Sequence, residues 1–442
     1  MRKVFTKNNL ERLRKFRLKK LENLKKAGIN CYPAKVLRTH TNKEAVDNFN
    51  KLKNKKITLV GRIRSIREHG GSTFCHIEDG TAQIQIYFKK DKIGNKNYKL
   101  FLENTDIGDF VEVGGKLFKT QKGEKTLEVS NWRIISKSLL PLPDKWYGFE
   151  DIEERFRKRY LDLILNREIK EKFIKRSEII RKIRRFLEGN GFLEVETPVL
   201  QTLAGGAKAR PFKTRLNALS MDLYLRIAPE LYLKRLLVGG FEKIYELGRS
   251  FRNEGMDREH NPEFTMLEFY AAYWDYKKMM DFTEKLLKPL DPKIFKGKFK
   301  KVEYGKIIGK RDEKEVFAKI KEPTFIINHP VEISPLSKKS EKNPKKVERF
   351  QLIANGLEIA NGFSEINDSI DQAERFKAQE IERKKGSKEA HQYDKDFIEA
   401  LEYGMPPAAG IGIGTDRLVV LLTNSKTLRE IILFPTMRPK KK

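Results

Sequence analysis

The residues with the clearest chemical potential lie between Arg249 and Tyr270, a segment that reads as two strands joined by a polar loop. Alternation along the strands predicts one apolar face, made of Tyr245, Leu247, Phe251, Thr265, Leu267 and Phe269. The opposite face then carries Arg252 and Glu254 from the first strand, and Phe264, Glu268 and Tyr270 from the second. Such a set can hold an adenine, a phosphate and an ammonium group. A plain surface hairpin is the competing interpretation.

A second polar cluster follows at Leu357–Glu365. In a regular strand, side chains alternate between the two faces, so Glu358 would lie on one face and Asn361, Phe363 and Glu365 on the other. All four side chains can face one cavity only if the strand bulges near residues 360–362, which Gly362 permits. Without a bulge, the strand would present these residues on both faces.

A third segment, Ala409–Leu418, alternates glycine with larger residues and runs into an apolar stretch. Alternate glycines leave room for a flat or anionic ligand against the strand. Thr415 or Asp416 can cap the helix that follows, and Arg417 falls in its first turn. A helix N-terminus beside a guanidinium favours a phosphate. The spacing matches neither a Rossmann nor a P-loop motif, and glycine-rich strands also serve packing alone.

The elements around these segments predict an α+β domain with an antiparallel sheet, because helices and strands alternate without a βαβ rhythm. Helices are expected at 153–165 and 169–189. The stretch 191–198 predicts a short strand whose terminal proline suits a sheet edge or a subunit boundary. Residues 296–321 are lysine-rich and are expected to form an exposed excursion.

Before this domain, the pattern predicts a small closed barrel of the OB-fold type, since five short strands fall within about 80 residues. They span 57–68, 73–78, 82–89, 109–118 and 126–136. One face would present Arg62 or Arg67, with Phe74, His76, Gln83 and Gln85. A ring for stacking beside amides for base edges suits unpaired RNA. A barrel that only packs against its neighbour is the alternative.

The remaining features bound the class of protein. The 442 residues carry 92 Lys and Arg against 61 Asp and Glu, a net charge of +31, which favours nucleic acid or reflects a general lysine bias. The helix expected over 8–27 is basic and either contacts a nucleic-acid backbone or is solvated. No apolar run approaches a membrane span. Only Cys31 and Cys75 are present, which fits a reducing cytoplasm.

The order of the segments resembles the three motifs of a class II aminoacyl-tRNA synthetase: a strand ending in proline, then Phe251-Arg-Asn-Glu254, then the glycine-rich strand with Asp416-Arg417. Residues 159–163 and the N-terminal barrel resemble the subclass of lysyl, aspartyl and asparaginyl enzymes. Within it, the chain is similar to the bacterial-type lysyl-tRNA synthetases, through the stretches 225–235, 361–365, 405–407 and 434–439.

The resemblance implies four regions: a basic helical extension (1–50), an OB-fold anticodon-binding domain (51–138), a linker (139–154) and a catalytic domain (155–442). It implies a cytoplasmic homodimer, without a membrane, that joins L-lysine to lysine tRNA using ATP and Mg²⁺. Arg252, Glu254 and Arg417 would be catalytic. ATP would be bound by these three and by His260, Asn261, Phe264 and Glu358, with adenine between Phe264 and Arg417.

The resemblance also assigns the other ligands. Lysine would be held by Gly206, Glu230, Glu268, Tyr270, Asn361, Phe363 and Glu365, with Glu365 and Tyr270 at the ε-ammonium. The anticodon would be read by Arg67, Phe74, Gln85 and Glu124. Glu358 would hold Mg²⁺. The family's second magnesium-binding acid is replaced here by Gln351, whose neutral oxygen is a weaker ligand.

Three rival functions remain open from the residues. A ligase that modifies a protein with lysine resembles only the catalytic half, so the barrel argues against it. A non-catalytic RNA-binding protein would not need Arg252, Glu254, Glu358 and Arg417. An aspartyl or asparaginyl enzyme is the nearest alternative in substrate, but aspartate would call for a cation where Glu365 stands.

Overall fold

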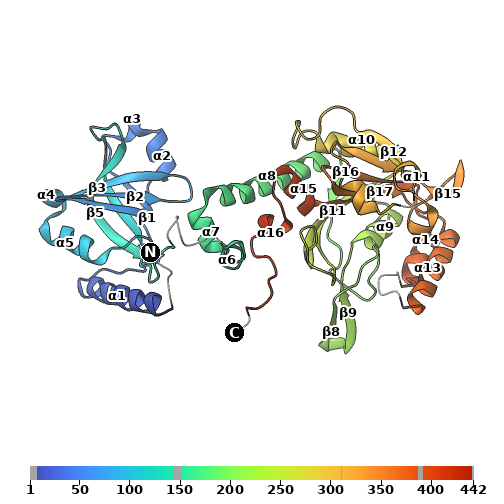
Figure 1. The fold of residues 1–442 in the computed structure, drawn as a ribbon, viewed down its shortest axis with the longest axis horizontal. Coiled ribbons are helices and arrows are strands. Elements are labelled where there is room, and N and C mark those ends of the chain that lie inside the picture. Colours follow the sequence, from blue (N-terminus) through green and yellow to red (C-terminus); the bar gives the residue numbers. More distant parts are fainter. Residues whose placement is uncertain (1–6, 144–150, 310, 387–391, 441–442) are drawn as a thin grey trace. The chain divides into compact units, whose positions relative to one another are not determined.

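The computed structural model describes residues 7–143, 151–309, 311–386 and 392–440. The chain forms two compact units, Met1–Ile152 and Glu153–Lys442 (Figure 1). The division falls within the predicted linker 139–154, of which residues 144–150 lie outside the described residues.

The first unit is the predicted closed barrel, with the strand order β1-β2-β3-β5-β4. Strand β1 pairs antiparallel with both β2 and β4, which closes the barrel, and β3 runs parallel to β5. Each predicted strand is confirmed to within one residue at either end. The bounds are β1 Ile57–His69, β2 Ser72–Glu78, β3 Gln83–Lys89, β4 Phe110–Lys119 and β5 Lys125–Ser136.

Among the described residues of this unit, five helices accompany the barrel: α1 Lys7–Lys26, α2 Asn42–Asp47, α3 Phe49–Leu52, α4 Lys90–Ile93 and α5 Asn95–Asn104. Leu21 and Leu24 of α1 belong to the barrel's hydrophobic core. Arg17 on the same helix is buried and donates to the carbonyl oxygens of Ser138, Leu140 and Ile107. The basic helix is therefore docked on its own unit by one face, while most of its other cations stay exposed.

The second unit is built on one mixed, mainly antiparallel sheet of eight strands, in the order β12-β13-β16-β17-β18-β11-β10-β6. Only the outermost pairs, β12 with β13 and β10 with β6, are parallel. The bounds are β6 Leu193–Glu194, β10 Lys243–Phe251, β11 Glu263–Ala272, β12 Lys300–Glu303, β13 Thr324–Ile327, β16 Arg349–Ala354, β17 Leu357–Ser364 and β18 Ala408–Gly414.

Helices cover both faces of this sheet. Their bounds are α6 Ile152–Arg157, α7 Arg159–Leu165, α8 Arg167–Gly189, α9 Glu230–Val238, α10 Tyr276–Leu287, α11 Tyr304–Ile307, α12 Glu313–Phe317, α13 Ser369–Lys384, α14 Lys395–Glu402, α15 Thr415–Leu422 and α16 Leu428–Ile431. Among the described helices, none combines the length and apolarity needed to cross a bilayer.

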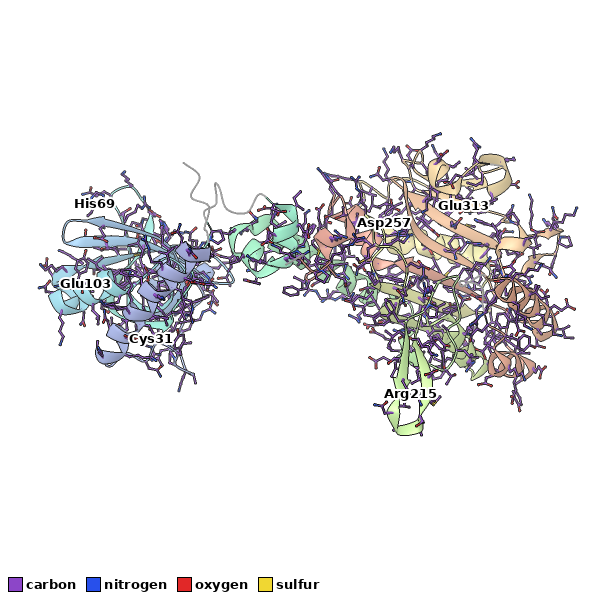
Figure 2. All side chains as sticks on the ribbon, turned by 60° about the horizontal axis from the view of Figure 1, so that its bottom comes forward. Cys31, His69, Glu103, Arg215, Asp257 and Glu313 are labelled. Atoms are coloured by element: carbon purple, nitrogen blue, oxygen red, sulfur yellow. The ribbon has the colours of Figure 1, made fainter. Side chains whose placement is uncertain are left out.

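Two small sheets complete the second unit. One joins β7 Leu200–Gln201, β8 Lys213–Leu216 and β9 Met221–Leu225, and the other joins β14 Lys339–Ser340 and β15 Asn343–Val347. Two 3₁₀ turns, Asn217–Leu219 and Val331–Ile333, lie beside them. Strands β8 and β9 form a ribbon that projects from the body of the unit, with Arg215 near its tip (Figure 2).

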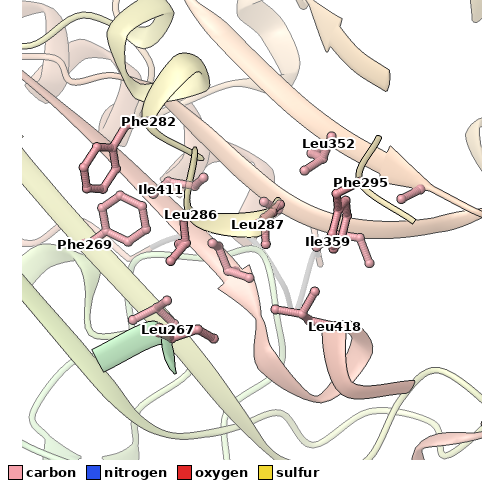
Figure 3. Packing of buried hydrophobic residues seen from close by; sticks show 14 of the residues in the cluster. Leu267, Phe269, Phe282, Leu286, Leu287, Phe295, Leu352, Ile359, Ile411 and Leu418 are labelled. Carbon is pink, nitrogen blue, oxygen red and sulfur yellow. The ribbon is translucent and has the colours of Figure 1, made fainter. Parts of the chain in front are cut away.

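The alternation predicted for β11 is confirmed. Leu267 and Phe269 pack into the main core with Leu286 of α10 and Leu418 of α15 (Figure 3). Tyr270, of the opposite parity, belongs to a separate core beneath α9 and α14. The strand therefore separates an apolar layer from the layer that carries the polar side chains.

The structure departs from several sequence predictions. The helix expected over 153–165 is broken at Lys158, whose backbone is not helical, and the buried guanidinium of Arg159, which begins the second segment, donates to the carbonyl oxygens of Arg429 and Leu433. The excursion expected over 296–321 is not wholly exposed, since its residues supply the edge strand β12 and two short helices. Neither Thr415 nor Asp416 caps α15, whose N-cap is Gly414.

Candidate active site

A cavity of about 460 Å³ lies in the second unit, above strands β11, β17 and β18. It is the place where the three predicted segments meet. The predicted residues that line it are Gly206, Glu230, Arg252, Glu254, His260, Asn261, Phe264, Glu268, Tyr270, Glu358, Asn361, Phe363 and Arg417. Glu365 and Gln351 do not line it, although both lie directly behind lining residues.

The loop between β10 and β11 supplies one cation and one carboxylate, Arg252 and Glu254, to the cavity. The alternation predicts that Arg252 and Glu254 belong to the first strand. This is wrong, because β10 ends at Phe251 and both residues lie on the loop that follows. The guanidinium of Arg252 lies over the ring of Phe264, with Cζ 5.0 Å from its centroid. A loop can bring its side chains to a ligand without the two-residue constraint of a strand.

A second cationic group joins segments far apart in the chain. Nη2 of Arg417, in the first turn of α15, lies 3.2 Å from Nε2 of His260. His260 Nδ1 in turn lies 2.9 Å from both carboxylate oxygens of Asp257. Arg417 also lies 3.6 Å from Glu358 Oε2. One edge of the cavity therefore brings the guanidinium of Arg417 and the ring of His260 together beside the carboxylate of Glu358, a positive patch suited to a polyphosphate that carries a cation.

The predicted bulge in β17 is present, but it falls at Ile359. Leu352 of β16 pairs with Ala360 of β17, but the next residue of β16, Ile353, pairs with Glu358. Ile359 therefore has no partner on β16. The extra residue brings Glu358 to the same face as Asn361 and Phe363, and all three line the cavity.

The other end of the cavity is acidic and buried. Glu230 and Glu268 line it, and Tyr270 Oη donates to Glu268 Oε2 at 2.9 Å. Burial raises the pKa of Glu268 to about 8, and repulsion from Glu230 adds to this effect. Gly206 closes this end with φ +86°, a conformation that glycine adopts without strain. Carboxylates in such a site favour a cationic ligand.

Glu365 lies behind this end of the cavity and is buried. Its Oε2 pairs with Nζ of Lys234 at 2.5 Å, and Lys234 also pairs with Glu230 Oε1 at 2.6 Å. Burial raises the pKa of Glu365 to about 8. A side chain added at Gly410, which lines the cavity, would overlap Glu365 Oε1 and the ring of Tyr270.

Sequence reasoning missed Lys234 and Arg349. Lys234 stands four residues after Glu230 on α9, and this spacing is the signal that could have found it. Arg349 lines the cavity, where its Nε donates to Asn361 Oδ1 at 2.9 Å. No pattern in the sequence marks Arg349, because it is the first residue of an ordinary apolar strand, β16.

Gln351 is buried behind Glu358. Its Nε2 donates to Glu358 Oε1 at 3.0 Å, and its Oε1 lies 2.8 Å from Nε2 of His329. Burial lowers the pKa of His329 to about 3, so the ring is neutral. With the amide nitrogen turned to Glu358, its oxygen is directed away from the carboxylate. Within the described residues, no group of three or more His, Cys, Asp or Glu side chains could hold a metal ion.

The barrel brings its four predicted residues to one face. Arg67 and Phe74 are direct partners across β1 and β2. Glu124 accepts from Gln85 Nε2 at 2.7 Å and lies 2.8 Å from Nε2 of His76. Phe74 also packs on Tyr87, with ring centroids 4.6 Å apart, an aromatic neighbour that the sequence prediction did not include.

Comparisons with known proteins agree with both units. Residues 151–438 match the family of class II tRNA synthetases (D, K and N), and residues 57–135 match the OB-fold nucleic acid binding domain. A lysine–tRNA ligase from Carboxydothermus hydrogenoformans is 50% identical, over 98% of this chain and 99% of its own. One from Pelotomaculum thermopropionicum is 49% identical, over 98% and 96%. One from Bacillus cytotoxicus is 45% identical, over 96% and 97%.

Proposed function

The chain belongs to the class II tRNA synthetases of the D, K and N group, and we propose that it is a lysine–tRNA ligase. It activates L-lysine with ATP to lysyl-adenylate and transfers the lysyl group to the 3′ end of lysine tRNA. The observation that carries the choice of lysine is the buried acidic end of the cavity, with Glu230, Glu268 and Glu365. An ammonium group can ionise these carboxylates and pair with them, whereas the side chain of an acidic amino acid or its amide offers no such partner.

Activation needs no nucleophile from the protein, because the carboxylate of lysine is ionised at neutral pH. Arg252 would hold this carboxylate against the α-phosphate of ATP, since it lines the cavity within reach of the charges of both Glu268 at the acidic end and Arg417 in the positive patch. Glu254, His260, Asn261 and Arg417 would bind the nucleotide, with the base against Phe264. Catalysis would then rest on alignment and on stabilisation of the negative charge at the phosphate.

The lysine side chain would extend toward Tyr270 and the oxygen of Glu365 beside Gly410. Asn361 and Phe363 flank this path, and Phe363 offers a ring against the aliphatic chain. Glu230 and Glu268, nearer to Gly206, would hold the α-ammonium group. A buried ammonium requires a carboxylate partner, because an unpaired charge costs several kcal/mol.

The cavity fits Mg²⁺ bound through the nucleotide. Magnesium usually takes one or two carboxylates together with substrate phosphates, and Glu358 stands at the positive edge where the phosphates would lie. The ion would neutralise phosphate charge. Gln351 offers Glu358 a hydrogen-bond donor, so we assign the metal to Glu358 and not to Gln351.

The remaining proposals concern the tRNA, the oligomer and the compartment. The barrel face with Arg67, Phe74, Gln85 and Glu124 would read the anticodon. A homodimer is supported by the exposed apolar residues Leu193, Val199 and Leu200 around the first motif. A cytoplasmic enzyme is consistent with two free, buried cysteines.

The test is ATP–pyrophosphate exchange measured with each standard amino acid in turn. Lysine alone should support exchange at a high rate, and only lysine tRNA should then be charged. Exchange driven by aspartate or asparagine, or tRNA binding without any exchange, would refute the proposal.

A further inference from the structure

Lys234 is a fully buried cation that sits between two carboxylates of the amino-acid end. It belongs to α9, where it follows Glu230 by one helical turn. Its Nζ lies 2.6 Å from Glu230 Oε1 and 2.5 Å from Glu365 Oε2, and 5.2 Å from the centroid of the Phe363 ring. It does not line the cavity, so its contacts are with the walls and not with a ligand.

Lys234 engages one oxygen of each carboxylate and leaves the other available. In the described part of the chain, Glu230 and Glu365 form ion pairs with no other residue. Both oxygens of Glu365 are buried without a hydrogen-bond partner; Oε2 is the one within ion-pair distance of Lys234, and Oε1 lies beside the cavity-lining Gly410. The unengaged oxygens are thus the ones free to meet a ligand, and the cation behind them fixes where they stand.

The other charged and polar groups around Glu230 and Glu365 do not pair with these two carboxylates. From β11, Glu268 and Tyr270 both face the cluster and add negative or polar groups. From β16, Arg349 faces it, but its donors are directed to oxygens of Asn361, Ile333 and Ser334. From the β10–β11 loop, Arg252 acts on Glu254 and Glu268.

We propose that Lys234 is a positioning residue for substrate selection. By holding one oxygen of Glu230 and one of Glu365, it aims the remaining oxygens at the cavity and counters their mutual repulsion, so that the site takes an amino acid with two ammonium groups. This inference rests on the proposed function and deepens it. Lys234 favours the ionised form of Glu230 and Glu365, so without it these carboxylates would hold their protons more tightly, and a substrate ammonium would have to displace them.

Lys234→Met and Lys234→Gln test this role, because both remove the charge and the glutamine keeps a hydrogen-bond donor. The KM for lysine should rise at least tenfold at pH 7, and the increase should shrink at pH 8.5. The KM for ATP should change by less than twofold. The preference for lysine over norleucine, which lacks the ε-ammonium, should fall. Calorimetry in buffers of different ionisation enthalpy should show more protons released on lysine binding.

A matched control is available in the barrel unit. Lys137 is also fully buried between two carboxylates, with Nζ 2.5 Å from Asp106 and 2.7 Å from Asp109. Lys137→Met makes the same chemical change away from the cavity, and it should leave the lysine KM and its pH dependence in the exchange assay unaltered. An equal pH effect in Lys137→Met would overturn the positioning role.

The outcomes separate the two proposals. No lysine-dependent exchange by the wild-type protein would refute the proposed function. Wild-type exchange with an unchanged lysine KM and pH profile in folded Lys234 variants would refute only this inference. If neither neutral variant folds, Lys234→Arg decides: it keeps the charge, so the lysine KM should rise while the pH profile stays that of the wild type. A shifted profile would overturn the role.

Discussion

The guanidinium of Arg252 covers one face of the Phe264 ring, at 5.0 Å from Cζ to the centroid. Arg252 stands just beyond β10 and Phe264 near the start of β11, so the turn of the chain brings the two together. One cation thereby reaches both the aromatic surface and the acidic end of the cavity. This position explains why Arg252 is the residue on which activation should depend most.

Arg252→Ala should lower lysine-dependent ATP–pyrophosphate exchange by about 100- to 1,000-fold, the usual effect of removing a group that stabilises charge in a transition state. The fold should survive, because the side chain faces a cavity. Arg249→Ala is the control, since Arg249 is exposed on the same strand and should keep wild-type exchange. Unchanged exchange in Arg252→Ala would refute its role.

Two of the three glycines of β18, Gly410 and Gly412, give a sharper test of where the lysine side chain ends. A methyl group at Gly410 would overlap Glu365 Oε1 and the Tyr270 ring, whereas at Gly412 its nearest neighbours would lie 3.7 Å away. Gly410→Ala should therefore abolish lysine binding, and overpacking should cost about 1–3 kcal/mol of stability. Gly412→Ala should retain exchange. Calorimetric titration with lysine checks both, and equal lysine affinities would move the ε-ammonium site elsewhere.

Much of this site follows from strand parity and residue order, as the separation of Leu267 from Tyr270 shows. The bulge in β17 was also predictable, because Glu358 and Asn361 could share a cavity only through an extra residue. Its location was not, since Ile359 differs little from its neighbours in propensity. Asp416 illustrates another limit. It fits a cap by sequence, yet its carboxylate accepts from Thr265 N and pairs with Arg176, which are distant in the chain.

The burial of Lys234 was not predictable, for a related reason, although its spacing from Glu230 marks a possible ion pair on the helix. A lysine on a helix is normally solvated, and burial between Glu230 and Glu365 depends on how α9 meets the end of β17. Lys234 and Glu365 are 131 residues apart in the chain, so no local pattern connects these two residues. Local spacing identified the ligand-facing groups but not the buried charge that supports them.

The raised pKa values predict how stability depends on pH. Burial raises the pKa of Glu268 and Glu365 to about 8 from an ordinary value of 4.5, so between these limits the folded protein holds more protons than the unfolded chain. The stability of the free protein should therefore fall as the pH rises from 6 to 8.5. Bound lysine favours the ionised carboxylates, so the increase in Tm caused by saturating lysine should grow over the same range.

Differential scanning fluorimetry with and without lysine measures this effect. Glu268→Gln and Glu365→Gln each remove one of the groups, and each should flatten the pH dependence of the lysine-induced shift. A lysine-induced shift that stays constant from pH 6 to 8.5 in the wild-type protein would contradict the assignment.

Gln351→Glu should change the response to magnesium. The new carboxylate would face Glu358, where the Gln351 amide now donates at 3.0 Å, so repulsion should lower the Tm of the free protein. With a non-hydrolysable ATP analogue present, a second carboxylate should strengthen Mg²⁺ binding and increase the Mg²⁺-dependent rise in Tm. Gln351→Met, which removes the donor without adding charge, should lose stability and gain no such response. Equal responses in the two variants would count against a metal at Glu358.

A substitution on the barrel face should impair the charging of tRNA and leave the activation of lysine unchanged. Phe74 packs on Tyr87 and pairs with Arg67 across the strands, so it presents a supported aromatic surface. Loss of one base-stacking contact costs about 1–3 kcal/mol, so Phe74→Ala should raise the KM for lysine tRNA by roughly 5- to 150-fold. Lys99→Ala on α5, outside the barrel strands, is the control and should leave charging unaltered. The exchange reaction needs no tRNA, so its rate should be unchanged in Phe74→Ala. If the exchange rate falls in parallel with charging, Phe74 acts through the stability of the protein and not through the anticodon.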